Sequence, residues 1–232
     1  MSVAPPVYIV RAGDSAISVE FEARVAPDVN TRAVALGTAL AQAAYPGVRD
    51  IVTSYRAVAV YFDPLRTDVE RLVSDIERLA RVRPTSVDSV RVPIEVPVAY
   101  GGEDGPDLEA IARHAGCTEA DVVRWHAAPI YRVYMVGFLP GFAYMGTVDP
   151  RIAIPRRSTP RLRVPRGSVA VAGEQTGIYP LETPGGWHLV GRTPVEPFDV
   201  DRDEPCLFKP GDLVRFEPMS GGRHAGLRGH RA

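Results

Sequence analysis

The sequence predicts an α+β protein in which a small N-terminal ββαββα layered domain precedes a C-terminal β-barrel domain. Two observations predict this class. In the first third of the chain, short apolar-alternating runs are separated by segments with apolar residues at helical spacing. From Tyr131 onward, short strand-like runs lie between frequent glycines and prolines, which favours a closed or nearly closed barrel. We expect the domains to cover residues 1–85 and 86–232, with the boundary near Ser86.

The elements of the N-terminal domain follow from apolar periodicity and from end signals. Pro27 suits the first turn of a helix, and Pro46-Gly47 stops it. Thr67-Asp68-Val69-Glu70 is a capping-box sequence that begins a second helix. These signals predict, in order, strands over Val7–Val10 and Ile17–Phe21, a helix over Pro27–Tyr45, strands over Val48–Ser54 and Ala57–Phe62, and a helix with apolar residues at helical spacing from Val69 to Leu79, in a layered domain that ends near Arg83.

The C-terminal domain begins with a strand of strict alternation over Val90–Tyr100. Pro93 and Pro97 would remove donors from one side of it, so we expect an edge strand or a segment that crosses between the domains. Thr118 is a plausible N-cap for the second of two short helices. The remaining expected elements are helices over Asp107–Ala115 and Glu119–His126, strands around Val169–Val171, Trp187–Val190 and Leu213–Phe216, and a frayed tail from Ser220.

Composition excludes several classes of protein. A hydrophobic content of 45% and a charged content of 24% are ordinary for a soluble protein, and a net charge of −1 argues against a nucleic-acid binder. The longest uncharged helical run, Ala33 to Tyr45, is too short to cross a membrane, and the N-terminal sequence lacks a secretory signal. The only cysteines, Cys117 and Cys206, form no disulfide framework, so we expect a cytoplasmic protein.

Residues 151–166, called the arginine segment below, contain six arginines and no acidic residue. A guanidinium presents a fixed fork of donors that suits a carboxylate or a phosphate. Arg156, Arg161 and Arg192 are therefore candidates for binding a small acid, and the polar tips of Tyr144 and Thr176 are candidates to assist them. The alternative is that these arginines pair with acids of a partner or remain solvated.

Motifs for autonomous catalysis are missing from the sequence. Neither G-x-x-x-x-G-K-[ST] nor G-x-G-x-x-G occurs, and the single lysine, Lys209, lies in a turn, so ATP binding would need arginines, backbone amides or another protein of a complex. Ser168, His188 and Asp199 could be imagined as a hydrolase triad, but no G-x-S-x-G elbow supports it. No His/Cys cluster indicates a metal, and the catalytic residues remain unassigned.

The stretch from Gly137 to Arg192 is dense in glycine and proline, and it also carries aromatic residues. Aromatic side chains beside glycines that expose the backbone suit the centre of a protein–protein interface, although they also suit a core. The candidate partner-binding residues are Phe138, Pro140, Phe142, Gly185, Gly186 and Trp187.

Four runs in this stretch also carry a family resemblance. GFLPGFAYMG (137–146), PRRSTPRLRVPRGSVAVAG (155–173), QTGIYP (175–180) and TPGGWHLVGRTP (183–194) resemble the Kip-inhibitor family. This family is also called the B subunit of bacterial 5-oxoprolinase, or allophanate hydrolase subunit 1. The resemblance implies a cyclophilin-like barrel of the carboxyltransferase type. It also implies an ATP-dependent conversion of 5-oxo-L-proline to L-glutamate, with ATP bound by a complex that includes a separate A protein and a larger C subunit.

Two other functions are compatible with the same resemblance. The chain could be a Kip-type inhibitor that binds a sensor histidine kinase and catalyses nothing. It could also be a carboxyltransferase module of a urea-amidolyase system, in which the same modules occur fused. The allophanate hydrolase activity is disfavoured, because the chain lacks the Ser-Ser-Lys pattern of an amidase and has only one lysine.

Overall fold

The computed structural model describes residues 7–82 and 92–219. The chain divides into two compact units, Met1–Val90 and Arg91–Ala232. The boundary expected near Ser86 lies outside the described residues.

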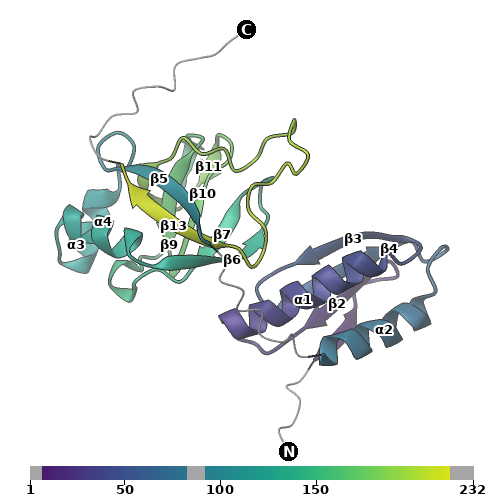
Figure 1. The fold of residues 1–232 in the computed structure, drawn as a ribbon. Coiled ribbons are helices and arrows are strands. Elements are labelled where there is room, and N and C mark those ends of the chain that lie inside the picture. The colour runs from purple at the N-terminus through teal and green to yellow at the C-terminus, as the bar shows by residue number, and fades with distance from the viewer. Residues whose placement is uncertain (1–6, 83–91, 220–232) are drawn as a thin grey trace, which may run out of the picture. The chain divides into compact units, whose positions relative to one another are not determined.

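In the first unit, two helices cover one face of a four-stranded antiparallel sheet with the strand order β1-β2-β4-β3 (Figure 1). Ile17 and Val19 of one strand and Val58 and Val60 of the next point to the helical side and are fully buried. The predicted ββαββα order is therefore observed. The elements are β1 (Tyr8–Arg11), β2 (Ala16–Glu20), α1 (Pro27–Ala43), β3 (Val48–Thr53), β4 (Ala57–Phe62) and α2 (Val69–Arg81).

The ends of these helices follow the signals in the sequence. α1 has proline in its first turn and ends at Ala43, where Ala44 takes a left-handed conformation before Pro46. The Asp68 side chain accepts a hydrogen bond from the Arg71 backbone N–H at 3.0 Å and so caps α2, one residue later than the predicted capping box places the cap. The Thr67 hydroxyl instead donates to the Pro46 carbonyl oxygen at 3.1 Å.

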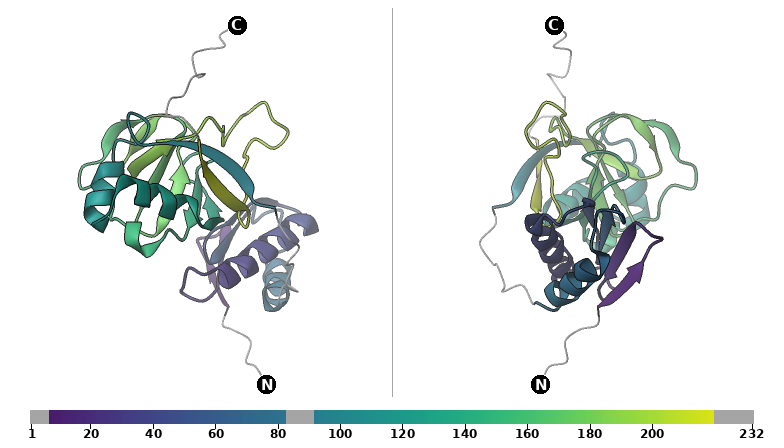
Figure 2. Two further views of the ribbon diagram at one scale, coloured as in Figure 1. Left: turned by 60° about the vertical axis from the view of Figure 1, so that its left-hand side comes forward. Right: turned by 90° about the vertical axis from the view of Figure 1, so that its right-hand side faces the viewer.

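The second unit is a closed barrel of seven strands in the order β10-β7-β6-β13-β5-β12-β9 (Figure 2). A separate two-stranded ribbon, β8 with β11, lies outside this barrel. The elements are β5 (Ile94–Tyr100), α3 (Leu108–Ala115), α4 (Glu119–Ala127), β6 (Ile130–Val136), β7 (Ala143–Gly146), a 3₁₀ turn (Pro150–Ile152), β8 (Arg161–Val164), β9 (Ser168–Ala172), β10 (Gln175–Ile178), β11 (Thr183–Gly185), β12 (His188–Arg192) and β13 (Leu213–Pro218).

Strand β5 corrects one expectation. It has neighbours on both sides, because it pairs in parallel with β13 and antiparallel with β12, so it is not an edge strand. β12, however, pairs only with Ala99 and Tyr100 at the end of β5. Pro97 therefore lies in the part of the strand that has a single paired neighbour, where a missing donor is tolerated.

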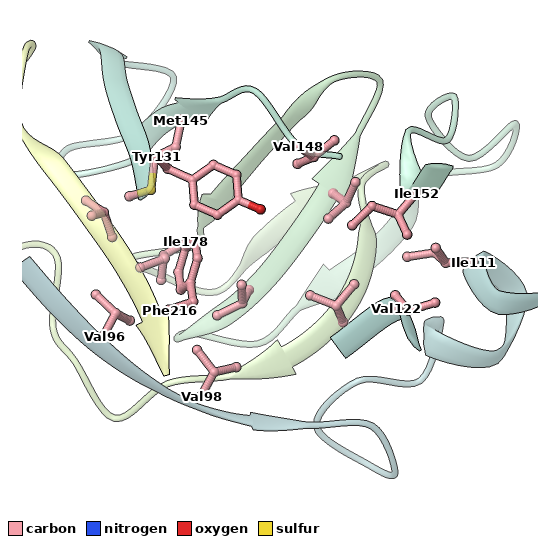
Figure 3. Packing of buried hydrophobic residues seen from close by; sticks show 14 of the residues in the cluster. Val96, Val98, Ile111, Val122, Tyr131, Met145, Val148, Ile152, Ile178 and Phe216 are labelled. Atoms are coloured by element: carbon pink, nitrogen blue, oxygen red, sulfur yellow. The ribbon is translucent and has the colours of Figure 1, made fainter. Parts of the chain in front are cut away.

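The barrel interior is filled by side chains rather than hollow. Figure 3 shows Tyr131, Met145, Ile178 and Phe216 pointing toward one another from different strands. Ile111 of α3 and Val122 of α4 join the same core, so the two short helices pack against the barrel. The barrel is thus a packed scaffold.

Candidate functional site

The buried carboxylate of Asp107 connects several segments on the outer side of the barrel by hydrogen bonds. It lies at the start of α3, is 4% exposed, and accepts hydrogen bonds from two residues of the arginine segment. Arg161 donates from both terminal nitrogens, Nη1 to Oδ2 at 2.7 Å and Nη2 to Oδ1 at 2.8 Å. Arg157 Nη1 donates to Oδ1 at 2.9 Å, and the Leu189 backbone N–H of β12 donates to Oδ2 at 2.7 Å.

The charges around Asp107 determine its ionisation. Burial alone would raise the pKa of this carboxyl, but hydrogen bonds from Arg161 and the Leu189 backbone, together with the two positive charges, bring it below the usual value. Asp107 is therefore ionised, and it balances part of the charge of Arg157 and Arg161.

His188 lies beside this group. Its Nε2 lies 3.0 Å from the Pro155 carbonyl oxygen, which can only accept, so Nε2 carries the proton. Burial lowers the pKa of His188, so the ring is neutral and Nδ1 is an acceptor. Nδ1 and the Nε of Arg157 are buried and have no hydrogen-bond partner in the described structure.

Within the described residues, five of the six arginines in the arginine segment pair with acids of the same chain. The pairs are Arg151–Asp149, Arg157–Asp107, Arg161–Asp107, Arg163–Glu182 and Arg166–Glu196. Arg156 is the exception in that part of the chain. Its guanidinium lies over the ring of Trp187, 5.8 Å from the ring centre.

The surroundings of Arg156 are aromatic. Phe142, Tyr144, Tyr179 and Trp187, called the aromatic cluster below, meet edge to face, with ring centres 4.8 to 5.8 Å apart. Burial raises the pKa of Tyr144, while the positive charge of Arg156 acts in the opposite direction. An exposed guanidinium thus lies close to a half-buried phenol and to the face of an indole. Such an arrangement can hold a small cyclic acid. The guanidinium would bind the carboxylate of the acid, and the ring of the acid would lie against the aromatic side chains.

The structure places the other predicted anion-binding residues differently. Arg161 is held by Asp107, and Arg192 Nε lies 3.3 Å from Asp104 Oδ1. The sequence suggested acids of a partner but gave no sign of acids in the same chain, because Asp104 and Asp107 lie far from these arginines in sequence. The geometry brings together only Tyr144 and Arg156 of the predicted set.

Thr176, the fifth predicted residue, belongs to a polar network inside the barrel. Its hydroxyl donates to the Ala170 carbonyl oxygen at 3.0 Å, so it accepts from His126 Nε2 at 2.9 Å. His126 Nδ1 therefore accepts from the Tyr100 hydroxyl at 2.7 Å. Burial lowers the pKa of His126 to about 3, so this histidine is a neutral core residue.

The candidate partner-binding residues divide into two groups. Phe138 and Pro140 are exposed, and Gly185 and Gly186 are half-buried. Phe142 and Trp187 are only 1% and 4% exposed, so their rings lie in a core, which was one of the two alternatives left open by the sequence. They form the packed floor beneath the arginine segment. Phe138 is 60% exposed and has a φ of 71°, an unfavourable conformation for an aromatic residue and one that concentrates at functional sites.

Residues that could hold a metal are not gathered in the described structure. No group of three or more His, Cys, Asp or Glu side chains with metal-binding geometry occurs within residues 7–82 and 92–219. In the same ranges, no helix combines the length and hydrophobicity needed to span a bilayer. Lys209 Nζ pairs with Glu204 at 2.5 Å in its turn.

Solved structures identify the class of this fold. The described chain resembles TTHA0988 with a TM-score of 0.80 and 40% identity, covering 89% of this chain and 40% of that one. PH0987 from Pyrococcus horikoshii matches with a TM-score of 0.55 and 42% identity over 91% of this chain and 97% of that one. The K. lactis urea amidolyase shares the fold at 22% identity and a TM-score of 0.73, over 95% of this chain and 15% of that chain. These matches confirm the expected fold class, an α+β protein with a closed β-barrel.

Sequence comparison then gives the family. The family model for the carboxyltransferase domain, subdomain C and D, matches residues 7–208. The 5-oxoprolinase B subunit of Bacillus subtilis (strain 168) is 36% identical, over 91% of this chain and 92% of its own length. That of Escherichia coli O157:H7 is 41% identical, over 90% and 95%. The chain belongs to this family and groups within it with the B subunits of 5-oxoprolinase, which confirms the resemblance noted in the sequence.

Proposed function

We propose that the chain is the B subunit of an ATP-dependent 5-oxoprolinase that opens 5-oxo-L-proline to L-glutamate. Similarity over nearly the full length of proteins named as 5-oxoprolinase B subunits supports this assignment. The chain would work in the cytoplasm in a heteromer with a separate A protein and a larger C subunit. ATP would bind to that complex, because this chain contains no phosphate-binding loop.

The structural observation that carries the proposal is the unpaired guanidinium of Arg156 over the aromatic cluster. 5-Oxoproline is a small five-membered lactam with one carboxylate. The carboxylate suits the fork of Arg156, and the ring suits the half-buried Tyr144 beside it. Arg161 and Arg192 are already neutralised by acids of the chain and are less suited to bind the substrate.

The chemistry assigned to the complex has two steps. Transfer of the terminal phosphoryl group of ATP to the lactam carbonyl oxygen releases ADP and makes the ring carbon electrophilic. Hydrolysis then uses two water molecules. The first adds to this carbon, the carbon–nitrogen bond breaks and the nitrogen takes up a proton, which leaves an acyl phosphate. The second attacks the acyl phosphate, so that phosphate leaves and glutamate is formed. The contribution proposed for this chain is to bind and orient the acid, since positioning supplies a large part of such catalysis.

Reconstitution tests the proposal directly. The chain would be co-purified with its large partner, combined with the A protein, and assayed for glutamate formation that requires both ATP and 5-oxoproline. We expect turnover by the complex, and no ATP hydrolysis by the chain alone. A complete complex that forms no glutamate, or a single chain whose ATPase is lost on mutating its own residues, would contradict the assignment.

The reconstituted complex also distinguishes this function from the two alternative functions. A Kip-type inhibitor would bind a sensor kinase and leave 5-oxoproline unchanged. A urea carboxylase module would need a biotin-carrier partner, and the 26% identity to a putative urea carboxylase of Emericella nidulans covers only 56% of this chain. The near full-length similarity to the B subunits of 5-oxoprolinase favours the hydrolase.

A further inference from the structure

The geometry points to Asp107 as a positioning residue that fixes Arg156 over the aromatic cluster by anchoring the arginine segment. Asp107 does not reach the proposed ligand position itself. The consequence for substrate affinity rests on the proposed function, whereas the anchoring of the segment is a property of this chain alone.

The first argument is the number of bonds on one buried carboxylate. Asp107 accepts four hydrogen bonds, three of them from Arg157 and Arg161 and one from the backbone of Leu189. It therefore ties the arginine segment to β12 and to the beginning of α3. Bonds between charged groups that are withdrawn from solvent are stronger than neutral ones, so this anchor is rigid.

The second argument is that the carboxylate has no role in its own helix. Asp107 stands at the N-cap position of α3, where an aspartate commonly accepts a backbone N–H from the first turn. Its side chain makes no such bond. Thr118 and Asp68, at the same position in α4 and α2, both cap their helices. The orientation of Asp107 thus serves the arginine segment rather than the helix.

The third argument is the position of Arg156 between fixed neighbours. On one side, the Pro155 carbonyl oxygen accepts from His188 Nε2 at 3.0 Å. On the other side, the Arg157 backbone N–H donates to the Gly186 carbonyl oxygen at 2.8 Å, and the Arg157 side chain reaches Asp107. The chain then passes over Gly186, where an added Cβ would make an ordinary contact, 3.6 Å from Pro160 Cγ. Arg156 can turn only its side chain, and that side chain lies over Trp187.

The anchoring is tested on the full chain without any partner. Trp125→Phe leaves Trp187 as the sole tryptophan, since the chain contains two. Trp187 is buried beneath the arginine segment, so acrylamide should quench its fluorescence weakly in this background. We expect Asp107→Asn to at least double the quenching constant. Glu182→Gln, which breaks only the exposed pair with Arg163, should leave the constant unchanged.

Asp107→Asn could instead unfold the chain, and a second variant covers that case. Arg161→Gln removes two of the three bonds from the arginines and leaves the Arg157–Asp107 pair intact. We expect this variant to keep the circular dichroism of the barrel and to raise the quenching of Trp187. Unchanged quenching in Arg161→Gln and in folded Asp107→Asn would overturn the inference.

The effect on the ligand is tested in the complex by a double-mutant cycle. If Asp107 acts through Arg156, Asp107→Asn should raise KM for 5-oxoproline about tenfold, as expected for the loss of one charge-assisted contact. In an Arg156→Ala background, Asp107→Asn should then add little. Equal effects on KM in both backgrounds would show a general structural role and would overturn the inference. If the wild-type complex shows no turnover, the proposed function fails, while the quenching result still decides the anchoring.

Discussion

At the scale of single residues, function depends on which polar groups remain unpaired. Within the described part of the arginine segment, five arginines are balanced by carboxylates of the same chain, and Arg156 is not. An exposed ion pair contributes little to stability, but it does occupy a guanidinium that could otherwise bind a ligand. Because the neighbouring arginines of the segment are paired within the chain, Arg156 is the one in this described part whose guanidinium is available to bind a ligand.

Substitution of Arg156 by lysine should weaken binding of the substrate acid in the complex. Lysine retains the charge but cannot offer two parallel donors to a carboxylate. We expect KM for 5-oxoproline to rise about tenfold, with a larger rise for Arg156→Ala. Arg163→Lys is the matched control, because Arg163 lies in the same segment and pairs with Glu182 at the surface. Equal kinetics for the Arg156 and Arg163 variants would refute the role of Arg156.

The buried His126 makes stability depend on pH. Its pKa is about 3 in the folded chain and about 6.5 when exposed, so the unfolded chain binds the extra proton between these values. This contribution is complete above about pH 6.5 and is lost as the pH falls, at up to about 1.4 kcal/mol per pH unit. Denaturation midpoints at several pH values between about 7 and about 5 measure the slope.

Two variants test whether His126 causes this dependence of stability on pH. His126→Gln should lower stability at neutral pH, since Thr176 and Tyr100 lose a partner, yet it should reduce the dependence on pH. Burial also lowers the pKa of His188, so this residue gives a slope of the same sign, which His126→Gln should leave in place. His114 is exposed, so His114→Gln should change neither quantity. The same slope with and without His126 would show that this histidine is not buried in its neutral form.

At the scale of elements, glycines let strands and loops of the barrel approach closely. Gly191 lies in β12 where that strand pairs with the end of β5. A Cβ at Gly191 would lie 2.6 Å from the Ala99 carbonyl oxygen and 2.7 Å from Val98 Cγ1. Neither atom can move freely, because Ala99 belongs to the ladder and Val98 to the core. The closure of the barrel at this seam therefore requires glycine.

Gly191→Ala should accordingly destabilise the second unit. We expect a loss of about 1–3 kcal/mol, the usual cost of forcing extra atoms into a packed interior. Urea denaturation followed by circular dichroism measures it. Gly186→Ala is the matched control for stability, since its Cβ would make only an ordinary contact at 3.6 Å with Pro160. If both variants denature at the same urea concentration, the close approach at Gly191 does not limit stability.

At the scale of the whole molecule, the two units have different exposed surfaces. The helices of the first unit cover one face of its sheet, and Tyr8, Val10 and Tyr61 remain exposed on the other. In the second unit, exposed apolar residues include Phe138, Leu162 and Leu181, all within Gly137–Arg192. A partner protein could therefore bind either unit, and the proposed contact is the Gly137–Arg192 stretch.

Phe138 should contribute to this contact in the assembled protein. Its exposed ring and unfavourable φ are features of a residue maintained for a function other than stability. We expect Phe138→Ser to reduce co-purification of the large partner, whereas Leu65→Ser, at a 95% exposed site in the first unit, should not. Hydrogen exchange with and without the partner gives an independent measurement. Protection confined to residues before Ser86 would place the contact in the first unit and refute this prediction.

The sequence by itself determined the order of elements and the family. Period-two and helical spacing, capping residues and glycine–proline turns are local signals, so the ββαββα order and the cap at Thr118 could be predicted. The capping-box sequence placed the cap of α2 at Thr67, one residue before the observed cap at Asp68. The long motifs between Gly137 and Pro194 carried the family resemblance.

The tertiary structure alone decided which residues face one another. Asp107 meets Arg157 and Arg161 across 50 and 54 positions of chain, and His126 meets Thr176 across 50. A lone aspartate before a helix is read as an N-cap, and no local pattern records the closure of a barrel that brings distant side chains together. For this reason the sequence could name Arg161, Arg192 and Thr176 as candidates but could not show that other side chains of the same chain already bind them. It also could not show that folding pairs the neighbouring arginines with acids and, within the described residues, leaves Arg156 without one.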